Sequence, residues 1–506
     1  MRSVVVVVFL LPGLSRAQDV CATCHPSEVA AFERSPMGRS VSRPTISSPG
    51  HVIDKIASSS ITIEHRGDTF AHKLEHRGVV AEYPVAYSVG AGVVGYSYMV
   101  WVGHHLFQSP ASYYTQTKRW DLTPGYETDR HIDFTHEISG GCLFCHTGSV
   151  NRIAGASNQF AEPPFTAISC ERCHGPTAAH LKNPIRGSIV NPAKLASANR
   201  DSVCEQCHLE GDARVLNPGR DWWDFEAGQA TESVFATYLR TTAGSLRAVS
   251  QSELLAQSRC ARESGGRLWC GTCHDPHGSA ANRSQEIRGI CLSCHADLFQ
   301  AKRHEAAADC VTCHMPRLRP TNVAHSAITD HSIPRKPPSS RAPESSKPIA
   351  WRDPGAVVAR RSLGIAYFDL ATSSHAASDV RSAYEILSHL PAEQMKDPVV
   401  VADLGSILLA NSETRAAVEM FTKATAREPS NARYAYCLAT ALAREGKTAA
   451  AIQELRRSID LDPSQVDAYI ELSKLYEKAG EETEARRVLS EYLRFMPQNI
   501  ELRSTE

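Results

Sequence analysis

Two short stretches, Cys270-Gly271-Thr272-Cys273-His274 and Cys291-Leu292-Ser293-Cys294-His295, follow one pattern, Cys-x-x-Cys-His. This pattern occurs seven times and contains 14 of the 16 cysteines. The five other copies begin at Cys21, Cys142, Cys170, Cys204 and Cys310. So regular a use of cysteine indicates one kind of site that is repeated along the chain. Only Cys260 and Cys437 lie outside the pattern.

The histidine after each second cysteine decides between three interpretations. A Cys-x-x-Cys pair alone fits half a zinc site, a redox dithiol or a haem attachment site. Zinc sites and dithiols do not need the adjacent histidine, whereas covalent c-type haem does, because it ligates the iron beside the two thioethers. We therefore predict seven covalent haems c. Their thioether positions are Cys21, Cys24, Cys142, Cys145, Cys170, Cys173, Cys204, Cys207, Cys270, Cys273, Cys291, Cys294, Cys310 and Cys313, and their proximal iron ligands are His25, His146, His174, His208, His274, His295 and His314.

Each iron also needs a sixth ligand or keeps an open position. Fifteen of the 22 histidines lie outside the motifs. His375 and His389 lie beyond the last motif in a different kind of sequence, which leaves 13 candidates for seven irons. This supply is ample for two histidines per iron, although Met37, twelve residues after His25, leaves a His/Met haem open.

The composition of the 506 residues excludes several classes of protein. Charged residues make up 22% and hydrophobic residues 42%, which rules out a mostly disordered chain. The 54 Lys and Arg balance 55 Asp and Glu, so no charge excess points to nucleic acid or to an anionic membrane surface. The length predicts about three domains.

The N-terminus suggests an exported protein. Arg2 precedes an apolar run from Val4 to Leu11, and the small-residue pattern Ser15-Arg16-Ala17 follows. Residues 1–17 therefore resemble a cleaved signal peptide. A membrane anchor is the alternative, but the run has about half of the ~20 residues that span a bilayer, and no other stretch approaches a membrane span. We expect a periplasmic or extracellular protein, which suits haem c because it is attached outside the cytoplasm.

The chain divides into parts of different composition. Residues 18–335 hold all seven motifs and form the predicted heptahaem domain, with six motifs in residues 142–314. So little chain per motif cannot build an ordinary core, so the porphyrins must supply most of the apolar surface. Residues of about 50–120 lack motifs, alternate in polarity and predict a small antiparallel β insertion. Residues 336–352 belong to a stretch rich in Pro and Ser and predict a linker.

Residues 353–506 repeat with a period of 34. Pro429, Pro463 and Pro497 have this spacing, as do Ala417, Ala451 and Ala485, and also Phe421, Leu455 and Leu489. The pattern is typical of tetratricopeptide repeats, in which a small residue lets paired helices approach and a proline ends the second helix. A generic helical bundle is the alternative. A fourth, irregular repeat near Leu363 and Tyr367 is expected to have a longer loop between its two helices. The fold class is thus mainly α: a haem-packed domain with a β insertion, then an α-solenoid.

Three stretches besides the motifs resemble a known family. They are residues 107–126, with Phe107-Gln108-Ser109-Pro110 at one end, residues 270–278, and residues 310–331 with His325 and His331. They are similar to exported multihaem cytochromes c with C-terminal tetratricopeptide repeats, whose haem part is related to the hydroxylamine oxidoreductase group. The resemblance implies distal iron ligands at His51, His180, His277, His304, His325 and His331. The resemblance gives weaker support to His104, His131 and His136 as distal ligands.

The resemblance and the motifs together favour electron transfer between redox partner proteins, with the repeats as a docking or assembly surface. The main alternative is a multihaem oxidoreductase that acts on a small nitrogen or sulfur compound at one open iron. A second alternative is a subunit of a conductive extracellular assembly. Whether the chain is an enzyme stays open, and an electron carrier is favoured because irons with two histidine ligands have no free position.

Overall fold

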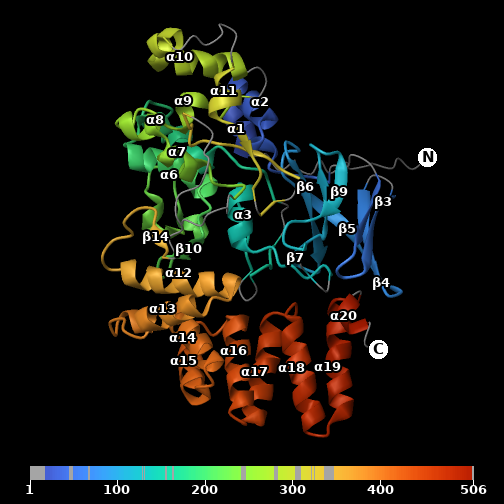
Figure 1. The fold of residues 1–506 in the computed structure, drawn as a ribbon. Helices are drawn as coiled ribbons and strands as arrows, with labels where there is room; N and C mark the ends of the chain where they lie inside the picture. The colour runs from blue at the N-terminus through green and yellow to red at the C-terminus, as the bar shows by residue number, and fades with distance from the viewer. Residues whose placement is uncertain are drawn as a thin grey trace, which may run out of the picture.

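The computed structural model describes residues 17–44, 49–66, 69–127, 129, 132–153, 157–161, 165–240, 247–278, 283–301, 309–320, 322–323, 325–335, 347–497 and 499–503. Residues 1–16 of the expected leader, His131, His304 and residues 336–346 of the expected linker lie outside these ranges. Figure 1 shows three neighbouring parts: a β-sheet from the N-terminal third, a group of short helices with the motifs, and a row of paired helices at the C-terminus.

The first part is a nine-stranded antiparallel sheet. Side chains alternate between buried and partly exposed along its strands, as Ile61 and Ile63 do on either side of Thr62, because one face of each strand covers an apolar core. The main path runs β2-β3-β4-β5-β6-β8-β9, while β1 pairs with β5 and β7 with β6. The strands are β1 Val41–Ser42, β2 Gly50–Asp54, β3 Ser59–Arg66, β4 Thr69–His76, β5 Val79–Val89, β6 Gly95–Val102, β7 His105–Gln108, β8 Ala111–Tyr114 and β9 Arg119–Leu122.

The sheet is larger than the small insertion that we expected over residues of about 50–120. It begins at Val41, which pairs with Val89, and it ends at Leu122. Strand β1 has only two residues, too few to produce an alternating pattern in the sequence. The expected mainly α fold class is therefore only partly correct, because this sheet and the short strands described below add substantial β-structure.

The motif-bearing part consists of short helices and loops. Its α-helices are α1 Ala17–Ala22, α2 Pro26–Arg34, α3 Gly140–His146, α4 Glu171–His174, α5 Ala178–Lys182, α6 Ser197–His208, α7 Gln251–Gln257, α8 Arg259–Glu263, α9 Cys270–Cys273, α10 Arg283–Ala301 and α11 Cys310–His314. Single 3₁₀ turns lie at Met37–Arg39, Pro192–Lys194, Trp222–Asp224 and Thr231–Ser233. The short strands are β10 Ala213–Leu216, β11 Phe235–Leu239, β12 Arg317–Leu318, β13 Ile328–Thr329 and β14 Ile349–Ala350.

The C-terminal part is a row of antiparallel helix pairs. They are α12 Ala359–Ser374 with α13 Ala377–Leu387, α14 Pro398–Ala410 with α15 Thr414–Arg427, α16 Ala432–Arg444 with α17 Thr448–Leu461, and α18 Val466–Lys478 with α19 Glu482–Phe495, followed by α20 Ile500–Arg503. Ala417, Ala451 and Ala485 are all buried, as the repeat pattern predicts. Helices α15, α17 and α19 each end two residues before the repeated proline.

The first repeat differs from our expectation. Only His375 and Ala376 separate α12 from α13, so its inter-helix loop is short. The additional residues lie instead between α13 and α14, where a 3₁₀ turn at Gln394–Lys396 precedes the N-cap Asp397. The sequence spacing reports only the total insertion in a repeat and not which of its two loops contains it.

The repeats pack against both other parts. One apolar cluster joins sheet residues such as Tyr83 and Phe134 to Tyr469 and Tyr492 of the last repeat. A second joins β10 and β11 to α12 and α14. The end of the expected linker is also ordered, because β14 pairs with β11 and Arg352 bonds to Glu205 of α6. The repeats therefore share their cores with the rest of the chain.

Candidate haem-binding site

Most motifs lie on one turn of helix or at the end of a short helix, whereas the sixth lies within α10, whose helical geometry is interrupted at His295. In three of them the histidine N–H donates to the carbonyl of the first cysteine: His25 to Cys21 at 2.8 Å, His174 to Cys170 at 2.9 Å and His274 to Cys270 at 2.9 Å. Such a turn places cysteines three residues apart on one face and the histidine beside them. This is the arrangement that two thioethers and one iron ligand require.

Three proximal histidines face a second histidine from a distant segment. Ring centroids are 6.4 Å apart for His25 and His180, 5.9 Å for His174 and His277, and 6.1 Å for His274 and His331. The ring planes meet at 21°, 12° and 28° respectively. An imidazole nitrogen lies about 2 Å from a transition metal, so two rings that share one metal have centroids about 6 Å apart. All three separations fit one iron between the rings.

Hydrogen bonds orient several of these rings for iron ligation. Nδ1 of His174 lies 2.8 Å from the carbonyl oxygen of Val190, and Nδ1 of His331 lies 2.9 Å from that of Thr329. The Nδ1–H group donates in both, which leaves Nε2 for a metal, as is usual for ligating histidines. His180 has a similar bond of 2.8 Å to the Ser188 hydroxyl, which itself donates to Ile185. Nδ1 of His314 lies 3.1 Å from the carbonyl oxygen of Pro334.

The surroundings of these pairs also suit a porphyrin. Val20, Leu181 and Ile185 are large apolar side chains exposed by 43%, 52% and 59%, close in sequence to His25 and His180. His146 and His208 are exposed, and yet enough protein surrounds them that desolvation lowers the pKa of both imidazoles. The residues present therefore fit haem c.

Thiols of different motifs contact one another. The pairs are Cys21 with Cys170, Cys145 with Cys207, Cys204 with Cys270, and Cys291 with Cys310. Cys173 is within electrostatic range of Cys204, and Cys273 of Cys291. The contacts and these two electrostatic neighbours together order the motifs as first, third, fourth, fifth, sixth and seventh, with the second beside the fourth.

The other predicted distal ligands do not face a proximal histidine in the part of the chain that the structure describes. His51 is exposed on β2 and bonds to Thr62. His325 bonds to Asp121 of β9 at 2.7 Å, and its ring contacts Tyr114. His136 pairs with Asp129 at 2.9 Å. His104 is exposed before β7, and His131 and His304 lie outside the described residues. Ligation by all of these, and by Met37 in its 3₁₀ turn, stays a prediction.

Sequence reasoning missed the polar residues that surround the motifs. Arg172, inside the third motif, is buried, and Arg214 of β10 lies close to the second and fourth motifs. An arginine in Cys-Glu-Arg-Cys-His reads as a solvent-facing position, because nothing in the motif indicates what covers it. The two cysteines outside the motifs, Cys260 on α8 and Cys437 on α16, are both partly buried.

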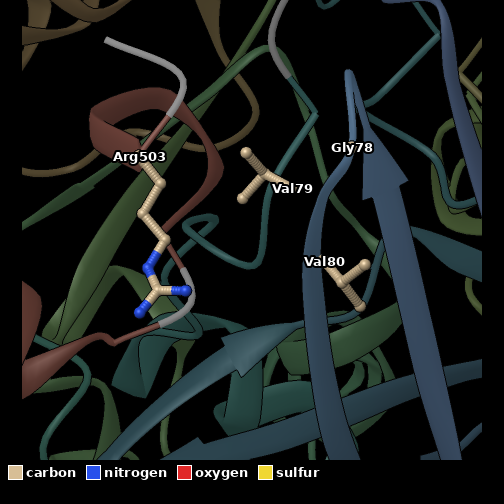
Figure 2. A pocket seen from close by; sticks show the side chains of 4 residues that line it. All are labelled: Gly78, Val79, Val80 and Arg503. Atoms are coloured by element: carbon tan, nitrogen blue, oxygen red, sulfur yellow. The ribbon is translucent and has the colours of Figure 1, made fainter. Parts of the chain in front are cut away.

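A surface pocket lies away from the motifs. It is lined by Gly78, Val79 and Val80 at the turn between β4 and β5 and by Arg503 of α20. Figure 2 shows the Arg503 side chain extending along this turn. None of these four residues belongs to a Cys-x-x-Cys-His motif.

Comparisons with known families match these features. Residues 97–175 match the family model "Cytochrome c554 and c-prime", and residues 263–300 match the doubled CXXCH motif. Residues 402–466 and 442–505 match tetratricopeptide repeat models. The chain is a multihaem c-type cytochrome with tetratricopeptide repeats. The expected relation of this cytochrome to the hydroxylamine oxidoreductase group stays a prediction.

One curated relative is the multiheme cytochrome MtrA of Shewanella baltica (strain OS185). It is 26% identical over 199 residues, which are 35% of this cytochrome and 58% of the relative. Among solved structures, a crystal structure of MamA covers 29% of this chain and 81% of its own, with 23% identity and a TM-score of 0.26. MamA from Desulfovibrio magneticus RS-1 covers 27% and 77%, with 14% identity and a TM-score of 0.25. Among the described residues of this cytochrome, no helix is long and apolar enough to cross a membrane.

Proposed function

We propose that this cytochrome carries electrons between redox partner proteins along a row of seven covalent haems c. The observation that carries the proposal is the closeness of the motifs. The Cys145 thiol donates to the Gln206 carbonyl oxygen at 3.8 Å, and the Gln206 amide donates to the Arg172 carbonyl oxygen at 2.9 Å, so the second, third and fourth motifs meet. Thiols of the other motifs contact a neighbouring motif or lie within electrostatic range of one. Haem iron supplies a one-electron couple when it is bound. The cysteines would hold the cofactors, and in three cases a proximal histidine and the histidine that faces it would ligate the same iron.

Two histidine ligands favour a carrier over an enzyme. An iron with both axial positions filled has no place for a substrate, and its ligand geometry changes little between oxidation states. The pairs around His25, His174 and His274 belong to the first, third and fifth motifs, so closed positions are spread along the row. We further propose that residues 1–17 are removed on export and that the repeats bind a protein partner.

The first experiment counts cofactors. The purified protein should have the mass of the chain from about Gln18 plus seven haems, and its ferric spectrum should be mostly low-spin. Zinc in place of haem, or an uncleaved N-terminus, would contradict the corresponding part of the proposal. A high-spin iron that binds nitrite, hydroxylamine or cyanide would favour the oxidoreductase instead.

The second experiment tests the continuity of the row. A photosensitiser attached at Lys182→Cys, an exposed position after His180, injects electrons near the first and third motifs. In the Cys204→Ser/Cys207→Ser variant the fourth haem is absent, so electrons should stay near the injection point. The matched control, Cys310→Ser/Cys313→Ser, also lacks one haem, but at the end of the row. Equal rates in the two variants would show that the fourth motif does not connect the halves.

A further inference from the structure

Arg172 belongs to the third motif and lies buried where this motif meets the second and the fourth. Its Nη2 donates to the carbonyl oxygen of Phe144 in the second motif at 2.9 Å. Its guanidinium carbon lies 4.1 Å from the ring centroid of Phe144 and 4.9 Å from that of Trp223. Its own carbonyl accepts from Gln206, which lies inside the fourth motif, at 2.9 Å. One side chain of the third motif therefore contacts the second motif, and its backbone contacts the fourth.

Arg214 reaches the same place from β10. Its Nη1 donates to the carbonyl of Gln206 at 2.9 Å, and its Nη2 donates to those of Glu205 and Leu209. The guanidinium also lies 5.1 Å from the ring centroid of Phe235. Carbonyl oxygens and aromatic faces hold both arginines in place, and they bring no full negative charge.

Neither arginine forms an ion pair with a residue of the described ranges. The carboxylate of Glu205 binds Arg352 at 2.6 Å. The positive charge of Arg247 lowers the pKa of Glu210 more than that of Arg214 does, although burial raises this pKa overall. The Nε–H groups of Arg172 and Arg214 are buried without a hydrogen-bond partner there. Both guanidinium groups act electrostatically on the Cys145 and Cys207 thiols, which contact each other. Two positive charges thus lie beside the meeting point of the second and fourth motifs.

We propose that Arg172 and Arg214 raise the reduction potentials of the haems attached in the second, third and fourth motifs, at residues 142–146, 170–174 and 204–208, above those of the other four. This inference rests on the proposed function. Reduction adds one electron to a ferric iron with no bond made or broken, and an external reductant such as dithionite supplies that electron. A nearby fixed positive charge stabilises the reduced form, more strongly in a buried setting than in water. Electrons would therefore collect at the middle of the row.

The test is a redox titration of the full haem-loaded protein, followed by its absorption and paramagnetic resonance spectra. Arg172→Gln and Arg214→Gln should each make reduction of the highest-potential components less favourable by on the order of tenfold, which is about 59 mV for a one-electron couple. Arg172→Lys and Arg214→Lys keep the charge and should titrate close to the wild type. The matched control Arg186→Gln removes an exposed arginine and should change nothing.

Two results would overturn the proposal: unchanged midpoints in both glutamine variants, as expected if haem propionates cancel the charges, or equal shifts in the lysine and glutamine variants. If the glutamine variants do not fold, a second measurement decides. Cys142→Ser/Cys145→Ser should lose a component of highest potential, whereas Cys291→Ser/Cys294→Ser should lose one of lower potential, and the reverse outcome contradicts the inference. Fewer than seven haems in the wild-type mass would contradict the proposed function instead.

Discussion

The imidazole rings of His174 and His277 lie 5.9 Å apart between centroids, with 12° between their planes, although the two residues are 103 positions apart in the sequence. His174 is anchored through Nδ1 to the Val190 carbonyl, and His277 follows the turn at Asp275, whose carboxylate accepts from the His277 N–H at 3.0 Å. The two histidines are thus held on opposite sides of one space. We therefore propose His277 as the distal ligand of the third motif, a pairing that the sequence alone does not indicate.

Replacement of His277 should open one iron. In His277→Ala the third haem loses its sixth ligand, so a high-spin ferric signal should appear in the paramagnetic resonance spectrum and integrate to about one iron. His389→Ala is the matched control, because this exposed histidine belongs to the first repeat and is not among the ligand candidates, so its removal should leave the spin state unchanged. If the control and not His277→Ala produces the signal, the assignment of distal ligands is wrong.

Arg240 and Asp379 join the motif-bearing part to the first repeat. The guanidinium donates to both carboxylate oxygens, at 2.9 and 3.0 Å, and the side chains are only 13% and 7% exposed. Asp379→Ala should lower the free energy of unfolding by about 3 kcal/mol, because it leaves a buried cation without its partner. Thermal or urea unfolding followed by circular dichroism would measure the loss.

The control for this prediction is the exposed pair of Arg259 and Glu263, with side chains 78% and 64% exposed. Glu263→Ala should change the free energy of unfolding far less, because water screens an exposed pair. Similar losses in both variants would show that Asp379 does not hold the two parts together.

The repeats could be predicted from the sequence because a solenoid repeats its local contacts. Ala417 and Phe421 recur as Ala451 and Leu455 at a fixed distance of 34 residues, and each is buried against its own or the next repeat. The haem-attachment motifs could be predicted for a similar reason, since five consecutive residues contain all the required chemistry. Both signals are local, so neither depends on how distant segments pack.

The remaining features depend on contacts across long separations. Val41 pairs with Val89, and Arg172 contacts Trp223, yet neither pair leaves a periodic signal in the sequence. The distal histidines show the same limit. Likeness alone suggested His51 and His180 equally, but only His180 faces a proximal histidine in the described residues. A histidine on a strand and one on a short helix look alike until their neighbours are known.

Asp403 should make the protein less stable at neutral pH than at mildly acidic pH. Burial raises the pKa of this carboxyl well above its usual value, and the nearby Asp369, whose own pKa is raised to about 6, adds to the effect. Both folded-state pKa values exceed the unfolded ones, so the folded state binds more protons and stability falls as pH rises above about 4.

Asp403→Asn should therefore raise the melting temperature at pH 7, by a few degrees if the gain is about 1 kcal/mol. The gain should disappear below about pH 3, where the carboxyl is protonated in both states. Glu393→Gln, which removes an exposed carboxylate, is the control and should change little. An equal gain for Asp403→Asn at both pH values would mean that charge at this position is not the cause.

The last repeat should depend on the β-sheet for part of its stability. Tyr492 of α19 is 1% exposed, its ring centroid lies 5.0 Å from that of Tyr469, and its hydroxyl contacts the Met496 sulfur at 3.3 Å. The same apolar cluster includes Tyr83 of β5, and Figure 1 shows α19 and α20 beneath the sheet. The end of a repeat array usually needs a polar cap, and here the sheet covers it instead.

Residues 353–506 expressed alone should therefore be helical, as their 34-residue period predicts, but should melt at a lower temperature than the repeats of the whole protein. A double-mutant cycle with Tyr83→Ala and Tyr492→Ala isolates the cause. In the full chain the two changes should be non-additive by about 0.5–3 kcal/mol, because they remove the same packing. In the fragment, Tyr492→Ala should cost less than in the full chain, since the sheet no longer covers this side chain. Additive losses, together with a fragment that melts as the full chain does, would show that the repeats fold independently of the sheet.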